Sequence, residues 1–338
     1  MRWYSGIDLH SNNSFMVVID ENDRVVYRRR LPNELDKILE ALEPYRGELA
    51  GVAVESTYNW YWLVDGLQVA GYKVHLANPA AMKRYEGLKH SGDDTDAVQL
   101  AHLLRLGILP TGYIYPVEER ALRDLGRRRL QLVRHRTMHV LAVENVQARE
   151  TGSRMTGDRV KRLSADEVQA LGFKEDVTLG LQANVAVIGT LNTEIAKLER
   201  RLLQCLKPRP EHALLGTVPG VGRILGPIIL LETGPIERFA AVGNYSSYAR
   251  CVNSVRISND RKKGEGNRRN GNKYLAWAFI EAANKARRWH PEARRFHDRK
   301  RARTNSIVAT KALAHKLARA CYHILKNRER FDMQRCFG

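Results

Sequence analysis

Two acids in the first third of the sequence are spaced so that they could bind one cation. Asp93 and Asp96 lie three residues apart in the stretch SGDDTDAVQLAHLL. Ser91, followed by acids and then by apolar residues at helical spacing, indicates the start of a capped helix. Residues three apart share one helix face. Acids in a first turn also serve the cap and the helix dipole, so this pair alone does not establish a metal site.

The elements before this stretch predict the positions of two further acids. Strand-like segments and two helical segments alternate as three strands, a helix, a strand, a helix and a strand, over residues 3–8, 15–20, 24–30, 35–42, 51–55, 58–70 and 73–77. This is the order of a ribonuclease-H-like mixed α/β sheet. In that order Asp8 and Glu55 project from neighbouring strands at one edge, and a helix from Asp93 closes over them. A sugar-kinase or actin-like fold begins similarly, but the sequence has no later Gly-rich adenosine segment.

Convergent carboxylates repel one another unless a divalent cation lies among them. Mg²⁺ fits an all-oxygen ligand set and keeps open positions for phosphate, and Mn²⁺ is the expected substitute. Two neighbouring acids are weaker candidates. Asp20 is expected in a solvated hairpin turn, and Asp94 points about 100° away from Asp93 around the helix.

Charge is distributed unevenly along the 338 residues. Residues 241–338 contain 24 Lys/Arg and 7 Asp/Glu, a net charge of +17, whereas residues 1–240 contain 32 and 30. A segment this basic favours a polyanionic partner, and nucleic acid is the commonest one. A basic surface that only aids solubility is the alternative.

The middle of the chain predicts two long helices. Residues 118–150 contain no proline, carry seven arginines between Arg120 and Arg136, and have an expected buried side of Leu122, Leu125, Leu130, Val133, Met138, Leu141 and Val146. The basic side could follow a nucleic-acid backbone or simply face solvent. Residues 151–180 are expected to form loops. A heptad seam then follows in Leu181, Val185, Ile188, Leu191, Ile195, Leu198 and Leu202. It could pack against the first helix or against a second copy.

The last third combines a glycine-rich turn with a basic loop. Pro219-Gly220-Val221-Gly222 between apolar flanks resembles a helix-hairpin-helix turn, and a plain helical hairpin is the alternative. Residues 245–274 lack apolar periodicity and are rich in Ser, Asn, Gly, Lys and Arg. The following helix and a later one carry an expected core of Leu275, Ala278, Phe279, Ala282, Val308, Leu313, Leu317, Cys321 and Leu325. A basic loop anchored at both ends can surround a phosphodiester.

Cysteines and hydropathy exclude other classes of protein. Cys205, Cys251, Cys321 and Cys336 form no CxxC or His-paired pattern, so neither a zinc site nor a disulfide framework is expected. No apolar run approaches the ~20 residues of a membrane span. The protein is expected to be cytoplasmic and to have no membrane partner.

Short motifs spread over almost the whole chain resemble one family. Gly6-Ile7-Asp8, Val54-Glu55-Ser56-Thr57, Asn78-Pro79 and Asp93-x-x-Asp96-Ala97 are similar to the amino-terminal domain of the insertion-sequence one-ten (DEDD) transposases. The segment 218–222, Phe239, residues 245–249 and residues 270–275 are similar to their carboxy-terminal domain. No single motif is specific, but their order and spacing together are.

The resemblance implies a site-specific DNA recombinase with a RuvC-like tetrad of Asp8, Glu55, Asp93 and Asp96 around Mg²⁺. It also implies a serine nucleophile in the basic loop, usually in a Ser-Gly pair. Here Ile257-Ser258-Asn259 occupies that place, so Ser258 is the candidate and Ser254 the alternative. The expected nucleic-acid contacts are Arg256, Arg261, Lys262, Lys263, Arg268, Arg269 and Lys273.

Partners implied by the resemblance are target and donor DNA, a noncoding bridge RNA, and further copies of the chain as a dimer or tetramer. The predicted domains are residues 1–115, a RuvC-like metal domain; 116–206, a helical linker and coiled coil; and 207–338, a mostly helical basic domain. Residues 181–206 would form a stiff spacer of about 40 Å, which favours a site shared between protomers. A metal-dependent nuclease or junction resolvase without a serine nucleophile, and a non-catalytic nucleic-acid-binding protein, are the alternatives.

Overall fold

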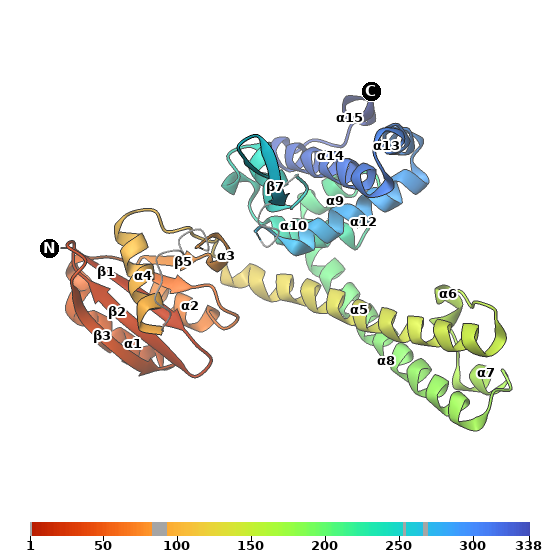
Figure 1. The fold of residues 1–338 in the computed structure, drawn as a ribbon, viewed down its shortest axis with the longest axis horizontal. Coiled ribbons are helices and arrows are strands. Elements are labelled where there is room, and N and C mark those ends of the chain that lie inside the picture. The colour runs from red at the N-terminus through yellow and green to blue at the C-terminus, as the bar shows by residue number, and fades with distance from the viewer. Residues whose placement is uncertain (1, 83–92, 253–254, 266–269) are drawn as a thin grey trace. The chain divides into compact units, whose positions relative to one another are not determined.

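The computed structural model describes residues 2–82, 93–252, 255–265 and 270–338. The chain divides into two compact units, residues 1–117 and 118–338, and each is described by itself (Figure 1). Among the helices of the described residues, none is long and apolar enough to cross a membrane.

The first unit contains a five-stranded mixed sheet with the strand order β3-β2-β1-β4-β5. The strands are β1 (Trp3–Leu9), β2 (Asn13–Ile19), β3 (Val25–Pro32), β4 (Leu49–Glu55) and β5 (Val74–Ala77). The first three form an antiparallel meander, and β4 and β5 extend the sheet in parallel beside β1. The helices are α1 (Leu35–Leu42), η1 (Glu43–Glu48), α2 (Tyr61–Val69), α3 (Pro79–Met82) and α4 (Asp93–Arg105). Every strand and helix predicted for this region is confirmed, with ends within three residues.

The two faces of the sheet bury different sets of side chains. One face packs with α1 and α2 through a large apolar core that includes Ile7, Val52 and Val54. The other face has the small residues Gly6 and Ala53 on its central strands, and α4 packs directly on it. Gly6 in β1 makes that close approach possible, because a Cβ there would lie 2.0 Å from the carbonyl oxygen of Ala97 in α4.

The second unit begins with two long helices that form an antiparallel hairpin. They are α5 (Val117–Thr151) and α8 (Glu175–Leu206). Arg129 Nε donates to Glu199 at 2.9 Å, and His139 Nδ1 lies 2.9 Å from Asn184 Oδ1, so residue numbers rise on one helix as they fall on the other. The chain just after α8 lies beside the first turn of α5, where Arg209 donates to Glu119 at 3.1 Å. Residues 181–206 thus run back along α5, so their length gives no support to a site shared between protomers, which stays a prediction.

The heptad seam of α8 packs within the chain rather than remaining free. Its residues Leu181, Val185 and Ile188 join Val140 and Val143 of α5 in one core. For two residues of α5 the prediction of a buried side chain is wrong, since Met138 is 68% and Leu141 50% exposed. At about 100° per residue, Met138 lies about 200° and Leu141 about 100° from Val140, so neither can share its buried stripe.

Residues 151–180 were expected to form loops, but they do so only in part. They contain the short helices α6 (Gly157–Val160) and α7 (Ala165–Gln169). Ser164 and Glu167 form a capping box that starts α7. Val160 and Val168 close the end of the hairpin core, which explains why a polar segment is ordered there.

The rest of the second unit is a helical bundle around one large apolar core. Its elements are α9 (Pro210–Leu215), α10 (Leu225–Thr233), η3 (Ile236–Arg238), α11 (Val242–Tyr248), α12 (Lys273–Trp289), α13 (Pro291–Arg303), α14 (Ser306–Asn327) and α15 (Met333–Phe337). The predicted core residues of α12 and α14 are buried except Val308, which is 40% exposed because it lies in the first turn of α14. Gly220 (φ +77°) packs on α12, where a Cβ would lie 2.0 Å from the Ala282 carbonyl oxygen. Backbone packing therefore requires this glycine of the predicted helix-hairpin-helix turn.

Candidate functional site

The ends of β1 and β4 bring two of the predicted acids to the same side of the sheet. The strands are parallel, with Ile7 paired to Val54, so Asp8 and Glu55 follow as the next residues on each strand. Side chains two apart on a strand share a face. Asp8 therefore shares the face of Gly6, and Glu55 that of Ala53, which packs with Leu100 of α4. Both carboxylates belong to the face that α4 covers.

The direction of α4 brings its first turn to these carboxylates. At its last turn, His102 Nδ1 lies 2.8 Å from Asp23 Oδ1 and Arg105 Nε donates to the same oxygen at 2.7 Å. Asp23 belongs to the turn after β2, and the end of β2 pairs with the start of β1. The helix therefore runs antiparallel to β1, and its start at Asp93 lies toward the strand end that carries Asp8.

The structure thus brings Asp8, Glu55 and the half-buried Asp96 toward one end of the sheet. The side chains of Asp93 and Asp94, and the proposed cap Ser91, lie outside what the structure describes. Among the described residues, no three His, Cys, Asp or Glu side chains are close enough to form a metal site by themselves. The donors are nevertheless carboxylate oxygens, which are the ligands that Mg²⁺ prefers. These residues fit a divalent cation by their chemistry.

His10 is a residue near this site that sequence reasoning missed. Its Nε2 lies 3.2 Å from Oδ2 of Asp8, which is 3% exposed. The backbone carbonyl of His10 accepts hydrogen bonds from Asn33 and Asn59, both at 2.9 Å, so its position is held from two elements. The signal in the sequence was the spacing of two from Asp8 at a strand end. The imidazole can orient the Asp8 carboxylate or exchange a proton with it.

Asp20 is a turn residue, as predicted, but it is not solvated. It is 6% exposed, and its Oδ1 accepts the backbone N–H groups of Asn22 and Arg24, both at 2.8 Å. The carboxylate is used to close the β2–β3 turn.

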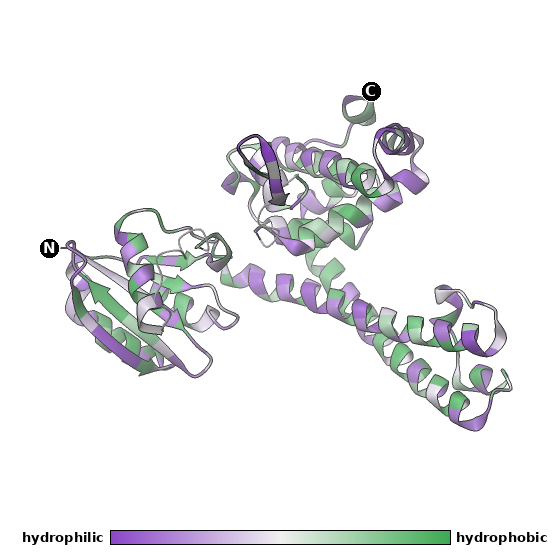
Figure 2. Cartoon of the chain, in the orientation of Figure 1, coloured by the Kyte–Doolittle hydropathy of each residue, from purple (hydrophilic) through white to green (hydrophobic). Residues whose placement is uncertain are grey.

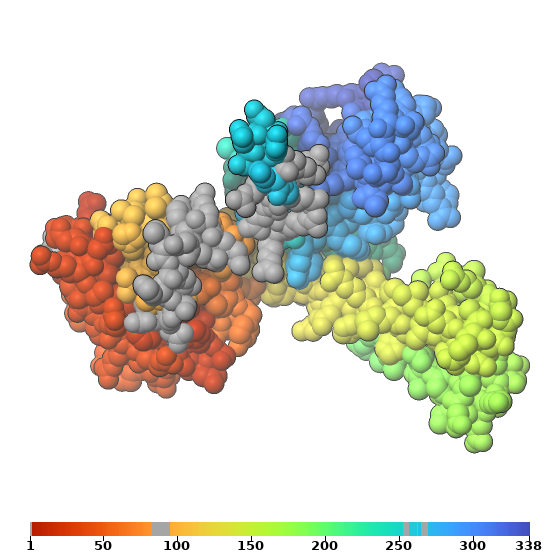
Figure 3. All heavy atoms as spheres, viewed as in Figure 1, coloured from red at the N-terminus to blue at the C-terminus, as the bar shows by residue number. Residues whose placement is uncertain are grey.

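The basic loop of residues 245–274 contains regular structure that the sequence did not predict. Strands β6 (Val255–Ser258) and β7 (Arg261–Glu265) form an antiparallel hairpin. Asn259 and Asp260 have φ of +52° and +54°, the conformation of a type I′ turn, which favours these residue types. Figure 2 colours this hairpin as hydrophilic, and Figure 3 shows it in cyan at the surface of its unit. The missed signal was the Asn-Asp pair between two short strands.

Ser258 is exposed and occupies the last paired position before the turn, opposite Arg261. In the described part of the chain, no side chain forms a hydrogen bond with its hydroxyl. Arg261, Lys263 and Lys273 are exposed cations around the hairpin. Ser254, Arg268 and Arg269, and the side chains of Arg256 and Lys262, lie outside the described residues.

A buried acid anchors the two ends of this loop. Glu232 in α10 is 2% exposed and accepts from Arg123 Nε at 3.0 Å, Arg127 Nε at 2.6 Å and Asn272 Nδ2 at 2.7 Å. Asn272 also caps α12, and its backbone N–H donates to the carbonyl of Tyr248 at 2.6 Å. The network therefore ties the last residue of α11 and the first turn of α12 to α5. The loop with Ser258 begins and ends on this network.

The Glu232 network is electrostatically strong. Burial alone would raise the pKa of the Glu232 carboxyl, but the hydrogen bond from Arg127 and the charges of Arg123 and Arg127 outweigh it and lower this pKa. Burial would likewise lower the pKa of Arg127, but Glu232 raises it above its ordinary value. Sequence reasoning missed this residue. The signal was one acid in the apolar run LGPIILLET.

Comparisons with known proteins place both ends of the chain with transposases. Residues 5–146 match a DEDD family of the IS110 type described as "Transposase", and residues 212–298 match "Transposase IS116/IS110/IS902 family". A "Probable family 20 transposase" of Pseudomonas aeruginosa is 23% identical over 95% of this chain and 96% of its own length. The "Insertion element IS110 uncharacterized 43.6 kDa protein" of Streptomyces coelicolor is 27% identical over 54% of this chain. The chain spans only 42% of that relative's length.

Proposed function

We propose that the chain is a transposase of the IS110 family that cuts and rejoins DNA as a site-specific serine recombinase. The first unit is proposed to be a RuvC-like, ribonuclease-H-like domain. Its DEDD tetrad of Asp8, Glu55, Asp93 and Asp96 holds a divalent cation, Mg²⁺ or Mn²⁺. Ser258 in the second unit is the proposed nucleophile, and it forms a phosphoserine link to DNA.

One observation carries the metal part of this proposal. Asp8 and Glu55 end adjacent parallel strands on the face covered by α4, and α4 starts with Asp93 toward the same end. When bound, the cation supplies charge neutralisation at the scissile phosphate. His10, held beside Asp8, fixes the orientation of that carboxylate.

Ser258 is placed to meet a strand from outside the protein. It lies at the exposed tip of a two-stranded hairpin beside Arg261 and Lys263. These cations bind the phosphates on either side of the one under attack. The Ser258 oxygen forms a bond to phosphorus as the strand's own P–O bond breaks. The released strand hydroxyl takes up the proton, and the reverse reaction on a second strand rejoins DNA.

The proposal extends to partners. The family resemblance adds a bridge RNA that pairs with target and donor DNA, and assembly as dimers that join into tetramers. The +17 charge of residues 241–338 favours both nucleic acids. Exposed Met138 and Leu141, three residues apart on α5, offer an apolar face for a second copy.

Covalent trapping tests the proposed chemistry. The full chain, incubated with Mg²⁺, its RNA and DNA carrying the element's junctions, is expected to give a protein–DNA adduct that survives denaturation. Ser258→Ala is expected to abolish the adduct. Ser247→Ala, which changes an exposed serine of α11 just before the loop, is expected to retain it. Adduct formation by Ser258→Ala that is lost in Ser254→Ala would reassign the nucleophile.

A metal-dependent nuclease or junction resolvase is the second candidate function. The observation that favours it is the lack of a hydrogen-bonded base at the Ser258 hydroxyl among the described residues. It predicts cleavage that survives Ser258→Ala without any adduct, with water as the nucleophile. A non-catalytic nucleic-acid-binding protein predicts instead that Asp8→Asn leaves every activity unchanged. The recombinase predicts that Asp8→Asn retains DNA binding and loses cutting.

A further inference from the structure

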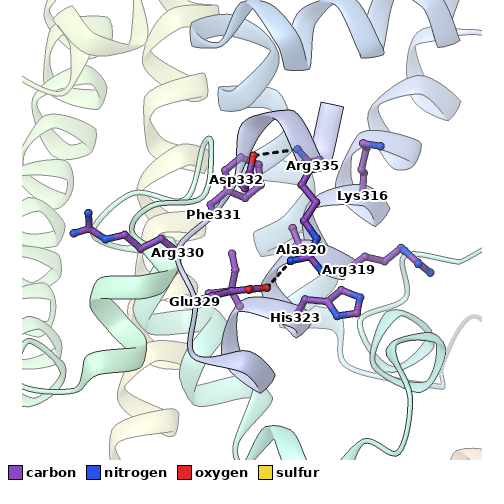
Figure 4. A pocket seen from close by; sticks show the side chains of 11 residues that line it. Lys316, Arg319, Ala320, His323, Glu329, Arg330, Phe331, Asp332 and Arg335 are labelled. Carbon is purple, nitrogen blue, oxygen red and sulfur yellow. Dashed lines mark hydrogen bonds and ion pairs between the residues drawn. The ribbon is translucent and has the colours of Figure 1, made fainter. Parts of the chain in front are cut away.

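A groove with a cavity volume of about 420 Å³ lies on the second unit. In sequence it is distant from the β6–β7 hairpin that carries Ser258, here called the serine hairpin. One wall is the second half of α14, which presents Lys316, Arg319 and His323. These are three and four residues apart and so share one helix face. The other wall is the segment of residues 329–336 that leads into α15 (Figure 4).

The acids of the groove already have partners in the chain. Glu329 Oε1 accepts from Arg335 Nη1 and from Asn327 Nδ2, both at 3.1 Å. Asp332 Oδ1 accepts the backbone N–H of Arg335 at 3.0 Å and thereby caps α15. Figure 4 shows both interactions of Arg335, which join residues of the same wall. The negative charges lining the groove are therefore used for its construction.

Two cations of the α14 wall have no such compensation. Among the ion pairs of the described residues, neither Lys316 nor Arg319 has a carboxylate partner. The Lys316 ammonium lies 5.1 Å from the ring centroid of Phe296 and 5.7 Å from that of Phe337. These rings hold the side chain and leave its hydrogen-bond donors available. Arg330 also lines the groove, and in Figure 4 the side chains of Arg319 and Arg330 extend outward on opposite sides.

We propose that this groove binds a phosphodiester of a nucleic-acid strand, with Lys316 and Arg319 contacting the phosphate. A concave site lined by Phe331 and by two cations that have no carboxylate partner among the described residues fits an anion with an attached apolar or aromatic group. The cavity volume exceeds that of a bare phosphate and falls in the range of about 300–1,000 Å³ that suits a nucleotide-sized ligand. DNA and RNA share this chemistry. The assignment goes beyond the recombination chemistry and requires only that the chain handles nucleic acid.

Cys336 makes the groove directly measurable, because its half-buried thiol lines the cavity. Cys251 and Cys321 are buried, so Cys205→Ser leaves Cys336 as the accessible thiol. The experiment measures the alkylation rate of Cys336 in the full chain carrying Cys205→Ser. Burial raises the pKa of this thiol, so the reaction is run at mildly alkaline pH. The probes are single-stranded DNA, single-stranded RNA and, at equal phosphate concentration, inorganic phosphate.

We expect a saturating oligonucleotide to slow alkylation several-fold. Arg319→Gln is expected to remove most of this protection and to lower the slope of log affinity against log salt by about 0.7, the value for one phosphate contact on a single strand. Lys326→Gln, the control, removes an exposed cation from the same helix outside the groove. It is expected to leave the protection unchanged. Thermal denaturation of both variants checks that they fold.

Protection by DNA alone, by RNA alone or by both supports the groove and names the strand that occupies it. Protection that is absent with both oligonucleotides, or equal with inorganic phosphate, overturns the proposal, as does protection that Arg319→Gln leaves intact. The measurement needs no cutting. Protection in a Ser258→Ala chain would therefore stand even if the proposed recombination chemistry failed.

Discussion

Replacing Glu232 by Gln tests whether the buried network stabilises the second unit. The change keeps the size and shape of the side chain but removes its charge. It removes the buried carboxylate that Arg123 and Arg127 share, and the side chains of these arginines are only 11% and 27% exposed. The Glu232 carboxylate accepts hydrogen bonds from two guanidinium groups and from Asn272. The amide NH₂ of a glutamine would face one of these donors in place of a carboxylate oxygen.

Removing one partner of a buried ion pair costs about 3–5 kcal/mol. The partial exposure of Arg127 lets water hydrate it, so we expect the lower end, about 3 kcal/mol. For a unit of this size, 1 kcal/mol shifts Tm by about 2–4 °C, so the melting temperature of the second unit is expected to fall by about 6–12 °C.

Circular dichroism melting of the full chain measures the effect. The matched control is Glu237→Gln, which removes an exposed acid only five residues away in η3. A surface change of this kind shifts stability by about 0.5 kcal/mol or less. If the two variants melted at the same temperature, the network would contribute no net stability and the reasoning would be refuted.

Three further outcomes follow from the structure. Gly6→Ala is expected to displace α4, because the added methyl collides with backbone, and to weaken the effect of Mg²⁺ on the melting temperature; an unchanged metal response would contradict this. Because the folded state lowers the pKa of the Glu232 carboxyl, its contribution to the free energy of unfolding is complete above its unfolded-state pKa of about 4.3. This contribution is lost as the pH falls through the lower, folded-state pKa. Urea unfolding is expected to show the free energies of unfolding of the wild type and of Glu232→Gln converging below the folded-state pKa. Met138→Lys with Leu141→Lys is expected to reduce self-association in sedimentation velocity without lowering the melting temperature, since both side chains are exposed.

The first unit was predictable because its pattern is local. Each strand is a short apolar run bounded by turn residues, so both the elements and the acids at the ends of β1 and β4 can be placed from the sequence. Gly6 shows what this procedure misses. Its role depends on the backbone of α4, nearly a hundred residues later, which no local pattern contains.

The second unit was less predictable because its features depend on pairing between distant segments. The apolar residues of α5 lie on several sides of the helix, and only the position of α8 selects Val140 and Val143 for the core over Met138 and Leu141. In the hairpin that carries Ser258, β7 (RKKGE) has no apolar residue, and the alternation of β6 (VRIS) spans only four residues, which is too short to reveal a strand.

Glu232 is a second residue whose role no local pattern contains, because its partners lie in distant segments of the chain. An acid in an apolar helix conflicts with local propensity, and such conflicts are tolerated where a distant partner compensates them. Here the compensation comes from α5 and from Asn272, so one carboxylate fixes the long helical hairpin and both ends of the serine loop to the same core. A loop anchored in this way has its two ends held in place. The buried charge is thus explained by the loop ends that it anchors, rather than by any chemistry of its own.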